Sequence, residues 1–387
     1  MKRFDLAVVG GGILGTFHAL AALEKGLSVI LLEKNSRPVH ASVRNFGQIV
    51  PSGMAGRWFD FGVRSMEVYR GIQSRRDIGI SQNGSVYVAS DPDEQQLLHE
   101  LYKVMTDRQY PCRLMSAREC LKTWSGLSAA YCTEGLFFPE ELSAEPAFTL
   151  EAIQQFMRET QSNFSHFTKT AVIRVEEQSE FVELTAASGQ TFQAGHVIVC
   201  NGGEFRILFP ELWSESGIQV CKLQMLSTIP LRTLNLKGNI LTGLTIRRYE
   251  SFSCLPSFSL ISTPQALEHL KEEGIHILFK QGRDGSVIIG DSHHYASADS
   301  AEDLGFDISE HVNQLILSEA RRILPIDGLD IARTWVGYYP QHKERDVFEL
   351  TISPRVHIRT AIGGKGMTSS AGYAEHSVAE ILSQSIK

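Results

Sequence analysis

The chain has 387 residues, 43% hydrophobic and 21% charged, so it is long enough for two domains and too apolar for a disordered protein. The formal net charge of −7 argues against a nucleic-acid partner, whose phosphates require a basic surface. Six cysteines without metal-type spacing predict free thiols and no metal site. Because no apolar run is long enough to span a bilayer, we expect a cytoplasmic protein without an integral membrane segment.

The N-terminal residues predict a strand, a helix and a second strand. Residues 4–9 have the composition of a buried strand, and residues 28–32 form a second continuous apolar strand. Between them, residues 13–25 carry apolar side chains at helical spacing. The three elements fit within about 30 residues, which is the size of a βαβ unit.

The turn after the first strand carries the glycine pattern G-x-G-x-x-G. Gly10 permits the tight turn, Gly12 lets a pyrophosphate approach the backbone, and Gly15 lets the helix pack closely on the strand. The start of the helix offers free N–H groups and a partial positive charge to phosphates. Glu33 follows the second strand, where its carboxylate would accept hydrogen bonds from ribose hydroxyls and repel a 2′-phosphate. The unit therefore predicts a dinucleotide site and disfavours NADP.

The rest of the chain mixes helices and strands. Apolar residues at helical spacing predict helices at 57–78, 92–108, 145–161, 264–273, 309–323 and 369–385. Apolar runs predict strands near 84–90 and at 171–176, 181–185, 195–200, 217–229, 240–262, 275–280, 286–290 and 356–362. Because no repeat or low-complexity linker separates these elements, we expect interleaved domains rather than domains in series.

Four segments, taken in order, are similar to those of a known family. They are the glycine fingerprint with Glu33-Lys34, the loop at 41–48 (Ala-Ser-Val-Arg-Asn-Phe-Gly-Gln), the strand and turn at 197–203, and the glycine-rich loop at 363–368. In this order they resemble the D-amino-acid oxidase and glycine/sarcosine oxidase superfamily of FAD-dependent oxidoreductases. The resemblance implies FAD as the cofactor.

The resemblance also implies an α/β + β architecture. A Rossmann-like FAD-binding domain would be interleaved with a mixed-sheet substrate domain, as in D-amino-acid oxidase. We expect the FAD-binding domain at 1–80, 145–215 and 325–387, and the substrate domain at 81–144 and 216–324.

The cofactor contacts that we expect lie on the four segments and on one further strand. They are Gly10, Gly12, Ile13, Leu14, Gly15, Glu33, Lys34, Ser42, Arg44, Asn45, Gly47, Val172, Asn201, Gly202, Gly364, Gly366, Met367 and Thr368. In the last segment, N–H groups at a helix start would stabilise negative charge on a reduced flavin. An ordinary helix cap by Thr368, Ser369 or Ser370 is the alternative for that segment.

The segment Thr334-Trp335-Val336-Gly337-Tyr338-Tyr339-Pro340 bears on the flavin linkage and on the substrate. Sarcosine oxidases attach the flavin through a cysteine after a similar segment, but no cysteine follows Cys254 here, so we expect non-covalent FAD. Glycine oxidase-like members have an arginine before the proline that clamps the substrate carboxylate. This chain has Tyr339 there, which puts a plain α-amino acid in doubt.

Several residues are candidates for contact with the substrate. We expect them to be Arg44, Arg248, Tyr249, His293, Tyr339 and Lys365, with Arg333 as a further basic residue. Arg248 and Tyr249 fall in the predicted strand at 240–262, and His293 follows a strand end. For each basic residue a surface charge or a flavin contact is the alternative, and for His293 a turn or surface histidine.

A closer resemblance concerns residues 42–47, Arg248-Tyr249 and the run Gly290-Asp291-Ser292-His293. These segments are similar to a bacterial clade associated with aminophosphonate breakdown, which implies a small-molecule amine substrate such as a 2-aminoethylphosphonate derivative. The expected reaction passes hydride from the α-C–H to flavin N5, and the resulting imine hydrolyses in water. Oxygen would then reoxidise the flavin to give hydrogen peroxide.

Three alternatives stay open. One is an oxidase of the D-amino-acid, glycine or sarcosine type. Another is an FAD-dependent amine dehydrogenase that uses an electron acceptor other than oxygen. A remote alternative is a flavoprotein acting on RNA, which the acidic charge balance opposes.

Overall fold

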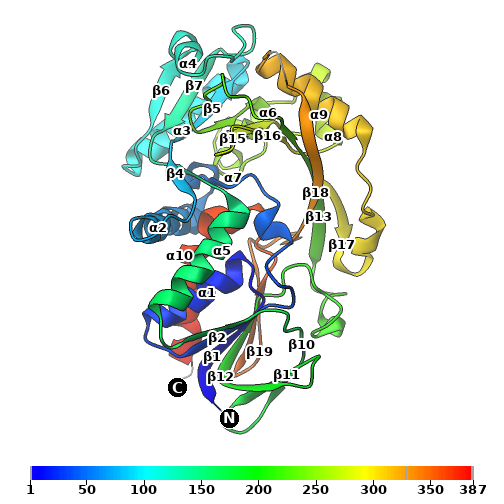
Figure 1. Cartoon of the computed structure of the whole chain (residues 1–387). Helices are drawn as coiled ribbons and strands as arrows, with labels where there is room; N and C mark the ends of the chain where they lie inside the picture. Colours follow the sequence, from blue (N-terminus) through cyan, green and yellow to red (C-terminus); the bar gives the residue numbers. More distant parts are fainter. Residues whose placement is uncertain (1, 327–328, 385–387) are drawn as a thin grey trace.

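The computed structural model describes residues 2–326 and 329–384. Two large β-sheets dominate it, and Figure 1 shows them at opposite ends of an elongated molecule. One sheet, with eight strands, lies beside helices α1, α5 and α10, and the other has nine strands. A three-stranded sheet consists of β3 (Gln48–Ile49), β8 (Leu142–Ala144) and β4 (Ile80–Gln82).

The eight-stranded sheet contains the N-terminal unit. Its order is β10-β11-β12-β1-β2-β9, with β20 paired to β12 and β19 to β20. Strands β1, β2, β9, β12 and β20 run parallel to their neighbours in this core, and all of β2 is buried. The strands are β1 (Arg3–Val9), β2 (Val29–Leu32), β9 (Phe164–Phe167), β10 (Val172–Glu177), β11 (Val182–Ala186), β12 (Thr191–Val199), β19 (Phe348–Ser353) and β20 (Val356–Thr360). Three distant parts of the chain therefore build one sheet, which confirms the expected interleaving.

Four helices pack together beside this sheet. Helix α1 contacts α5 and α10, and α10 also packs along α2. They are α1 (Ile13–Glu24), α2 (Gly56–Gln73), α5 (Pro146–Thr160) and α10 (Gly366–Gln384). Parallel strands under helices explain the continuous apolar runs of the sequence, because such strands are buried on both faces.

The nine-stranded sheet is mostly antiparallel. Its order is β17-β13-β16-β15-β14-β5-β7-β6, with β18 paired to β13. The strands are β5 (Ser85–Ala89), β6 (Arg113–Ser116), β7 (Glu134–Phe138), β13 (Ile218–Thr228), β14 (Asn239–Leu241), β15 (Leu278–Gln281), β16 (Val287–Gly290), β17 (His294–Ser297) and β18 (Ile331–His342). Its helices are α3 (Pro92–Asp107), α4 (Ala117–Thr123), α6 (Gly243–Ile246), α7 (Glu250–Ser253), α8 (Glu268–Glu272) and α9 (Glu310–Ile323).

The long pair β13–β18 runs from the nine-stranded sheet toward the eight-stranded one (Figure 1). The two strands pair antiparallel along nearly their whole length, with Cys221 opposite Tyr339. Strand β18 ends at His342, close to the chain that enters β19 and β20. This pair therefore connects the two halves and places Tyr339 between them.

The sequence predictions differ from the structure in several places. The predicted strand at 240–262 is wrong: beyond β14 this segment forms the short helices α6 and α7, with Arg248 and Tyr249 between them. Strand β18 was not predicted, since Gly337 and Pro340 interrupt its pattern. The last helix begins at Gly366 rather than at residue 369. Its predicted end at residue 385 lies outside the described residues. The expected domains also include residues 1, 327–328, 386 and 387, which lie outside the described residues as well.

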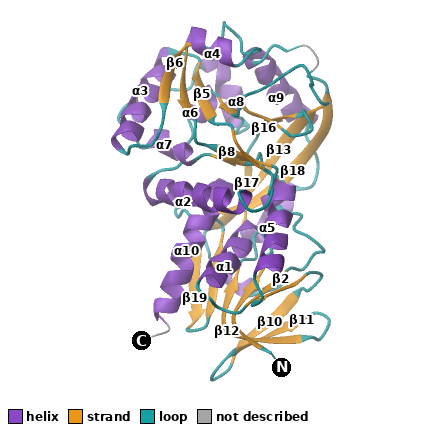
Figure 2. Ribbon diagram, turned by 60° about the vertical axis from the view of Figure 1, so that its left-hand side comes forward, coloured by secondary structure: helices purple, strands orange, loops and turns teal. Residues whose placement is uncertain are grey.

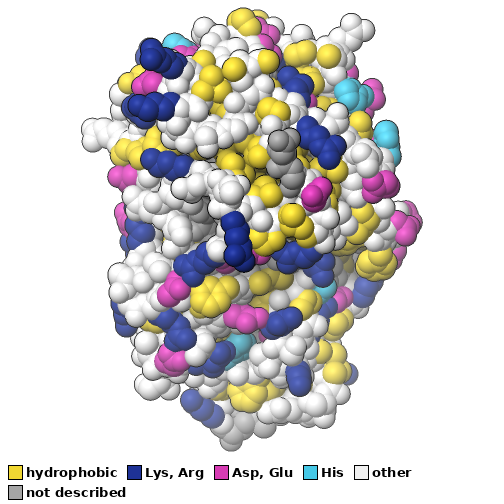
Figure 3. Space-filling model, turned by 45° about the horizontal axis from the view of Figure 1, so that its top comes forward, with side chains coloured by type: hydrophobic (Ala, Val, Ile, Leu, Met, Phe, Trp, Pro, Cys, Tyr) yellow, Lys and Arg dark blue, Asp and Glu magenta, His cyan; other side chains and the backbone are white. Residues whose placement is uncertain are grey.

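The surface in Figure 3 carries basic, acidic and apolar side chains interspersed with one another. Among the helices of residues 2–326 and 329–384, none combines the length and the apolar character needed to cross a membrane.

Candidate active site

One cavity of about 550 Å³ joins the two halves of the molecule. Its lower part is lined by the glycine fingerprint, the loop at 41–48 and the loop at 363–368. Its upper part is lined by side chains of the nine-stranded sheet and its connections, namely Arg248, Tyr249, His276, Asp291, His293 and Tyr339. Segments far apart in the sequence thus meet around one chamber.

The glycine turn is packed too tightly for larger residues. Gly10 has φ +106°, and a Cβ there would lie 2.2 Å from the carbonyl oxygen of Cys200. A Cβ at Gly15 would lie 1.9 Å from the carbonyl oxygen of Gly10. Gly12 precedes α1 in an extended conformation and, as a glycine, has no side chain to cap the helix. The turn therefore presents a helix N-terminus to the cavity, which suits a pyrophosphate.

Glu33 is held directly against the fingerprint. It is 6% exposed, its Oε2 accepts a hydrogen bond from Gly11 N at 2.8 Å, and its Oε1 accepts one from Asn35 N at 2.8 Å. The neighbouring Lys34 forms an ion pair with Glu204. The carboxylate of Glu33 is thus fixed beside the turn, while the charge of Lys34 is already paired.

The loop at 41–48 packs on the start of α1. Ser42 Oγ accepts a hydrogen bond from Ile13 N at 2.9 Å. Asn45 Oδ1 accepts one from Gly47 N at 2.8 Å, and its Nδ2 donates to the carbonyl of Ser42 at 3.0 Å. Arg44 donates through Nε to the carbonyl of residue 39 at 2.8 Å and through Nη1 to that of residue 336 at 3.1 Å. The guanidinium of Arg44 therefore ties this loop to β18.

The second glycine-rich loop leads directly into α10. Gly364 has open space where a Cβ would stand, and Gly366 is the first residue of the helix. Thr368 Oγ1 accepts a hydrogen bond from Val50 N at 3.2 Å, and the carbonyl of Met367 accepts one from the Tyr69 hydroxyl. Because Thr368, Ser369 and Ser370 lie inside the first turn, the alternative of a helix cap by these residues is wrong.

The ammonium group of Lys365 is paired at the edge of the cavity. Its Nζ forms ion pairs with Glu250 and, at 3.3 Å, with Asp346. Only 13% of its side chain is exposed. Both acidic partners line the same cavity, so Lys365 has less free charge for a substrate anion than its sequence position suggested.

Arg248 is the basic residue that the structure leaves most available in the upper cavity. Its exposed side chain lines the cavity, and its Nη2 donates to the Tyr295 hydroxyl at 2.8 Å. In the described part of the chain, it has no carboxylate within 4.0 Å, unlike Arg247, which binds Asp91 and Glu94. Arg333 is exposed on β18 and does not line this cavity.

Two aromatic hydroxyls also line the upper cavity. Burial raises the pKa of Tyr339 well above its ordinary value, and it raises that of Tyr249 as well, with the Asp291 charge adding to both. Both phenols therefore stay protonated and act as hydrogen-bond donors. Tyr339 offers a hydroxyl in the place where a carboxylate clamp was expected in glycine oxidase-like proteins.

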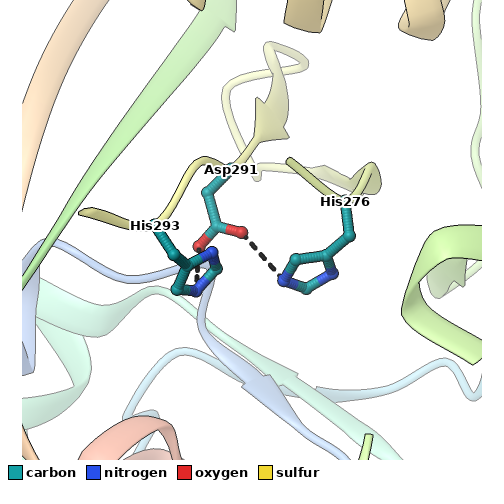
Figure 4. A group of neighbouring side chains, drawn as sticks. All are labelled: His276, Asp291 and His293. Atoms are coloured by element: carbon teal, nitrogen blue, oxygen red, sulfur yellow. Dashed lines mark ion pairs between the residues drawn. The ribbon is translucent and has the colours of Figure 1, made fainter. Parts of the chain in front are cut away.

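A buried cluster of His276, Asp291 and His293 faces the same chamber (Figure 4). His276 Nε2 lies 3.1 Å from Asp291 Oδ1, and His293 Nε2 lies 3.8 Å from Asp291 Oδ2. Their side chains are between 4% and 8% exposed. Within the described ranges this is the group whose ligand atoms are spaced as for a metal ion. Of the three, only His293 was singled out from the sequence.

The hairpin β15–β16 brings these residues together. His276 precedes β15 and Asp291 follows β16, and their backbones exchange hydrogen bonds of 3.1 and 2.9 Å. The sequence predicted this hairpin from its alternating pattern. Continuing the predicted strand pairing beyond the strand ends would have placed His276 close to Asp291. Glu250, which pairs with Lys365, lies in the segment predicted as a strand and gave no such signal.

Some predicted cofactor residues lie around the cavity rather than on its wall. Gly10 and Gly15 form the tight turn, Glu33 holds it, Lys34 is paired with Glu204, and Val172 is buried in β10. Asn201 Nδ2 donates to the carbonyl of Glu204 at 2.6 Å, while its neighbour Gly202 lines the cavity. The lining residues of the prediction are Gly12, Ile13, Leu14, Ser42, Arg44, Asn45, Gly47, Gly202, Gly364, Gly366, Met367 and Thr368.

A glycine-tight turn at a helix start, opening into a chamber under a second sheet, defines a two-part dinucleotide-binding protein. The chain belongs to the DAO family of FAD-dependent oxidoreductases, whose model matches residues 5–380. FAD is therefore its cofactor. The open space at Gly364 and the turn at Gly12 fit this group, since both glycines line the cavity without a side chain of their own.

Solved structures with the same fold include several oxidoreductases. Glycine oxidase from Geobacillus kaustophilus is 16% identical with a TM-score of 0.76, covering 99% of this chain and 95% of that one. L-proline dehydrogenase from P. horikoshii is 16% identical with a TM-score of 0.80, covering 98% and 93%. L-α-glycerophosphate oxidase from Mycoplasma pneumoniae, with FAD bound, is 15% identical with a TM-score of 0.77, covering 99% and 95%. A search of curated protein sequences gives no match.

Proposed function

We propose that this protein oxidises the CH–NH bond of a primary or secondary amine whose other end carries a phosphonate, such as a 2-aminoethylphosphonate derivative. The observation that carries the proposal is the free guanidinium of Arg248 in the same cavity as the dinucleotide turn. Solved relatives include proteins named as oxidising glycine, L-proline and L-α-glycerophosphate, so amines and a phosphate ester both occur as substrates on this fold.

The charges around the cavity favour a phosphonate over a plain carboxylate. Arg44 donates two hydrogen bonds to backbone carbonyls, and Lys365 forms ion pairs with two carboxylates. Arg248 keeps donors for an anion, with the Tyr295 hydroxyl bound to it. A guanidinium offers a planar fork that matches two oxygens of a phosphonate, and hydroxyl donors can bind the third.

The chain's residues would hold the substrate between the two halves of the cavity. Arg248 would bind the anion, the hydroxyls of Tyr249 and Tyr339 would orient the molecule, and the backbone N–H groups at the start of α10 would help to hold the cofactor. When bound, FAD supplies the hydride acceptor at N5 and passes the electrons to oxygen or another acceptor. Side chains of the nine-stranded sheet and its connections cover this side of the cavity.

We also propose that FAD is held without a covalent bond, that the protein is cytoplasmic, and that the two domains have the expected bounds with one change. Strand β18 pairs with β13 throughout, so 331–342 is assigned to the substrate domain. Release of all flavin into the supernatant after acid precipitation is the expected result for non-covalent binding.

The proposed function is tested by anaerobic mixing of the flavin-loaded protein with a panel of amines. Each amine is offered as a pair, with and without a phosphonate, next to glycine, sarcosine and D-alanine. We expect bleaching of the oxidised flavin spectrum by the aminophosphonates at the lowest concentrations. If the amino acids bleach the flavin and the aminophosphonates do not, the phosphonate assignment is wrong. If the whole panel leaves the flavin oxidised, the amine assignment is wrong.

A further inference from the structure

The starting point is the hydrogen bonding of His293. Its Nδ1 lies 2.9 Å from the carbonyl oxygen of Gly274, which can only accept, so Nδ1 carries the ring proton. In a neutral ring, Nε2 then has a free lone pair. Nε2 lies 3.8 Å from Asp291 Oδ2, which is too far for a hydrogen bond. His293 therefore presents an unused proton acceptor beside a carboxylate.

The carboxylate of Asp291 is held in place but accepts few hydrogen bonds. Its Oδ1 lies 3.1 Å from His276 Nε2, yet this oxygen has no hydrogen bond with proper geometry in the described part of the chain. His276 is held on its other side, where Nδ1 lies 3.0 Å from Thr245 Oγ1. A buried carboxylate with so few donors has capacity left to stabilise a positive charge that arises next to it.

The charges that face His293 are few. The titratable groups around its ring are Asp291, His276, Arg248, Tyr295 and Tyr339. Burial lowers the pKa of His293 to about 3, while the Asp291 charge acts in the opposite direction. At neutral pH the ring is thus uncharged and ready to accept a proton. Burial acts to raise the pKa of Asp291, but the contact with His276 and the Arg248 charge lower it, so the carboxylate is ionised.

An amine needs its lone pair to release hydride from the adjacent carbon, yet amines reach the protein as ammonium ions. We propose that His293 Nε2 takes the proton from the substrate's ammonium group and that Asp291 stabilises the imidazolium so formed. The inference rests on the proposed function. The N–H bond of the ammonium breaks, its electron pair stays on the amine nitrogen, and a new N–H bond forms at Nε2. Nothing is oxidised in this step, and hydride transfer follows it.

The surroundings of the cavity affect both the substrate's ammonium group, which donates the proton, and His293, which accepts it. Burial weakens His293 as a base, but the same dry chamber and the nearby Arg248 charge also make a bound ammonium more acidic. Asp291 favours the imidazolium, because its negative charge lies 3.8 Å from Nε2. His276 is a positioning residue, since it holds Asp291 through the backbone pair and the 3.1 Å contact.

A metal ion is the competing ligand for this cluster, because two imidazole nitrogens and a carboxylate are typical ligands. The Arg248 charge in the same chamber opposes a dication there, whereas an aminophosphonate brings its own compensating anion. The cluster therefore fits an amine substrate better than a metal.

The test measures anaerobic flavin reduction by an aminophosphonate between pH 6 and 10 in the holoenzyme. His293→Gln is expected to slow reduction about 100-fold at pH 7, within the range typical of a lost proton acceptor. Its rate should keep rising up to the pKa of the free amine, whereas the wild-type rate levels off at lower pH. Asp291→Asn should shift the profile in the same direction. The matched control His357→Gln alters another buried histidine, whose Nδ1 lies 3.1 Å from Thr351 Oγ1 and which does not line the cavity. It should keep the wild-type profile.

A second measurement does not depend on turnover. Nitrogen NMR of the ¹⁵N-histidine-labelled holoenzyme, compared with His293→Gln, should show the His293 ring neutral with its proton on Nδ1 at pH 7. A charged ring, or a proton on Nε2, would overturn the inference. Unchanged pH profiles in His293→Gln, or a stoichiometric tightly bound metal whose removal stops flavin reduction, would also overturn it. A wild-type flavin that no amine reduces would instead show that the proposed function has failed, and the inference with it.

Discussion

Two arginines that are adjacent in the sequence have opposite surroundings. The side chain of Arg247 is 5% exposed and binds Asp91 at 2.6 Å and Glu94 at 2.8 Å. Arg248 points into the cavity and binds only a tyrosine hydroxyl in the described residues. One residue is part of the protein's framework and the other is available to a ligand.

Arg247→Ala is expected to lower the free energy of unfolding by about 3–5 kcal/mol, because it leaves the fully buried Glu94 carboxylate without its partner. Urea unfolding monitored by circular dichroism measures this change. A loss below about 1 kcal/mol would mean that Glu94 finds another partner or takes up a proton.

Arg248→Ala is expected to leave the free energy of unfolding within about 0.5 kcal/mol of wild type, because its side chain is exposed in the cavity. It should raise the KM for an aminophosphonate about 10- to 100-fold, as expected for a lost charge-assisted hydrogen bond of about 1.5–3 kcal/mol. The KM for the matched amine without a phosphonate should change little. An equal rise for both amines would contradict anion binding by Arg248.

The helical glycines Gly15 and Gly71 form a matched pair for testing the cofactor turn. Gly15→Ala places a Cβ 1.9 Å from the carbonyl oxygen of Gly10, whereas Gly71→Ala meets nothing within 4 Å. We expect Gly15→Ala to lower both the melting temperature and the flavin-to-protein ratio. Gly71→Ala should stabilise the protein by about 0.5–1 kcal/mol. Equal flavin content in the two variants would contradict the role of the turn.

At the scale of elements, a buried glutamate joins the short helix at 51–53 to the chain between β7 and β8. Glu141 is fully buried, and its Oε1 accepts hydrogen bonds from Ser52 N at 2.8 Å and from the Tyr110 hydroxyl at 3.4 Å. Burial raises the pKa of Glu141 from 4.5 to about 7. The folded protein therefore holds this proton more tightly than the unfolded chain does.

The stability that Glu141 contributes is present below pH 4.5 and is lost as the pH rises through about 7. Glu141→Gln removes the ionisation, so the variant should lose less stability than wild type between pH 5 and 8, by on the order of a few kcal/mol. Melting temperatures across this range provide the measurement. Parallel curves for the two proteins would show that Glu141 does not ionise there.

The elements that the sequence predicted best are those with local signals. The fingerprint, the parallel strands and the long helices follow from periodicity and glycine spacing, and the family resemblance gave FAD. Strand β18 was not predicted, because Gly337 and Pro340 break the alternation of apolar and polar residues. In the structure its pairing with β13 holds it in place. The contact between His276 and Asp291 depends on hairpin pairing beyond the strand ends. The partners of Arg44 and Lys365 depend on tertiary packing that no local pattern carries.

At the scale of the whole molecule, the cofactor site is assembled from three distant stretches of chain. Strands β1, β12 and β20 lie side by side, and the loops after them converge on one cavity. Strands β13 and β18 carry the substrate side of the cavity toward this sheet. Binding of FAD should therefore stabilise both halves together.

Added FAD is expected to raise the free energy of unfolding by about 2.7 kcal/mol at a concentration 100 times its Kd. Thermal unfolding should be monitored separately in each half. The fluorescence of Trp58, which packs on Tyr373 of α10, reports on one half, and that of Trp124, in the core beside the nine-stranded sheet, reports on the other. Single-tryptophan variants make the two signals distinct. A rise in the midpoint at Trp58 alone would show that the halves unfold independently.

The central claim is that one cavity brings an anionic amine to FAD. It is tested most directly by anaerobic flavin reduction with N-methyl-2-aminoethylphosphonate and with N-methylethylamine, which differ in the phosphonate. We predict that the phosphonate reduces the flavin at far lower concentration, and that Arg248→Ala removes most of this difference. Equal reduction by both amines, or reduction by neither, would contradict the account.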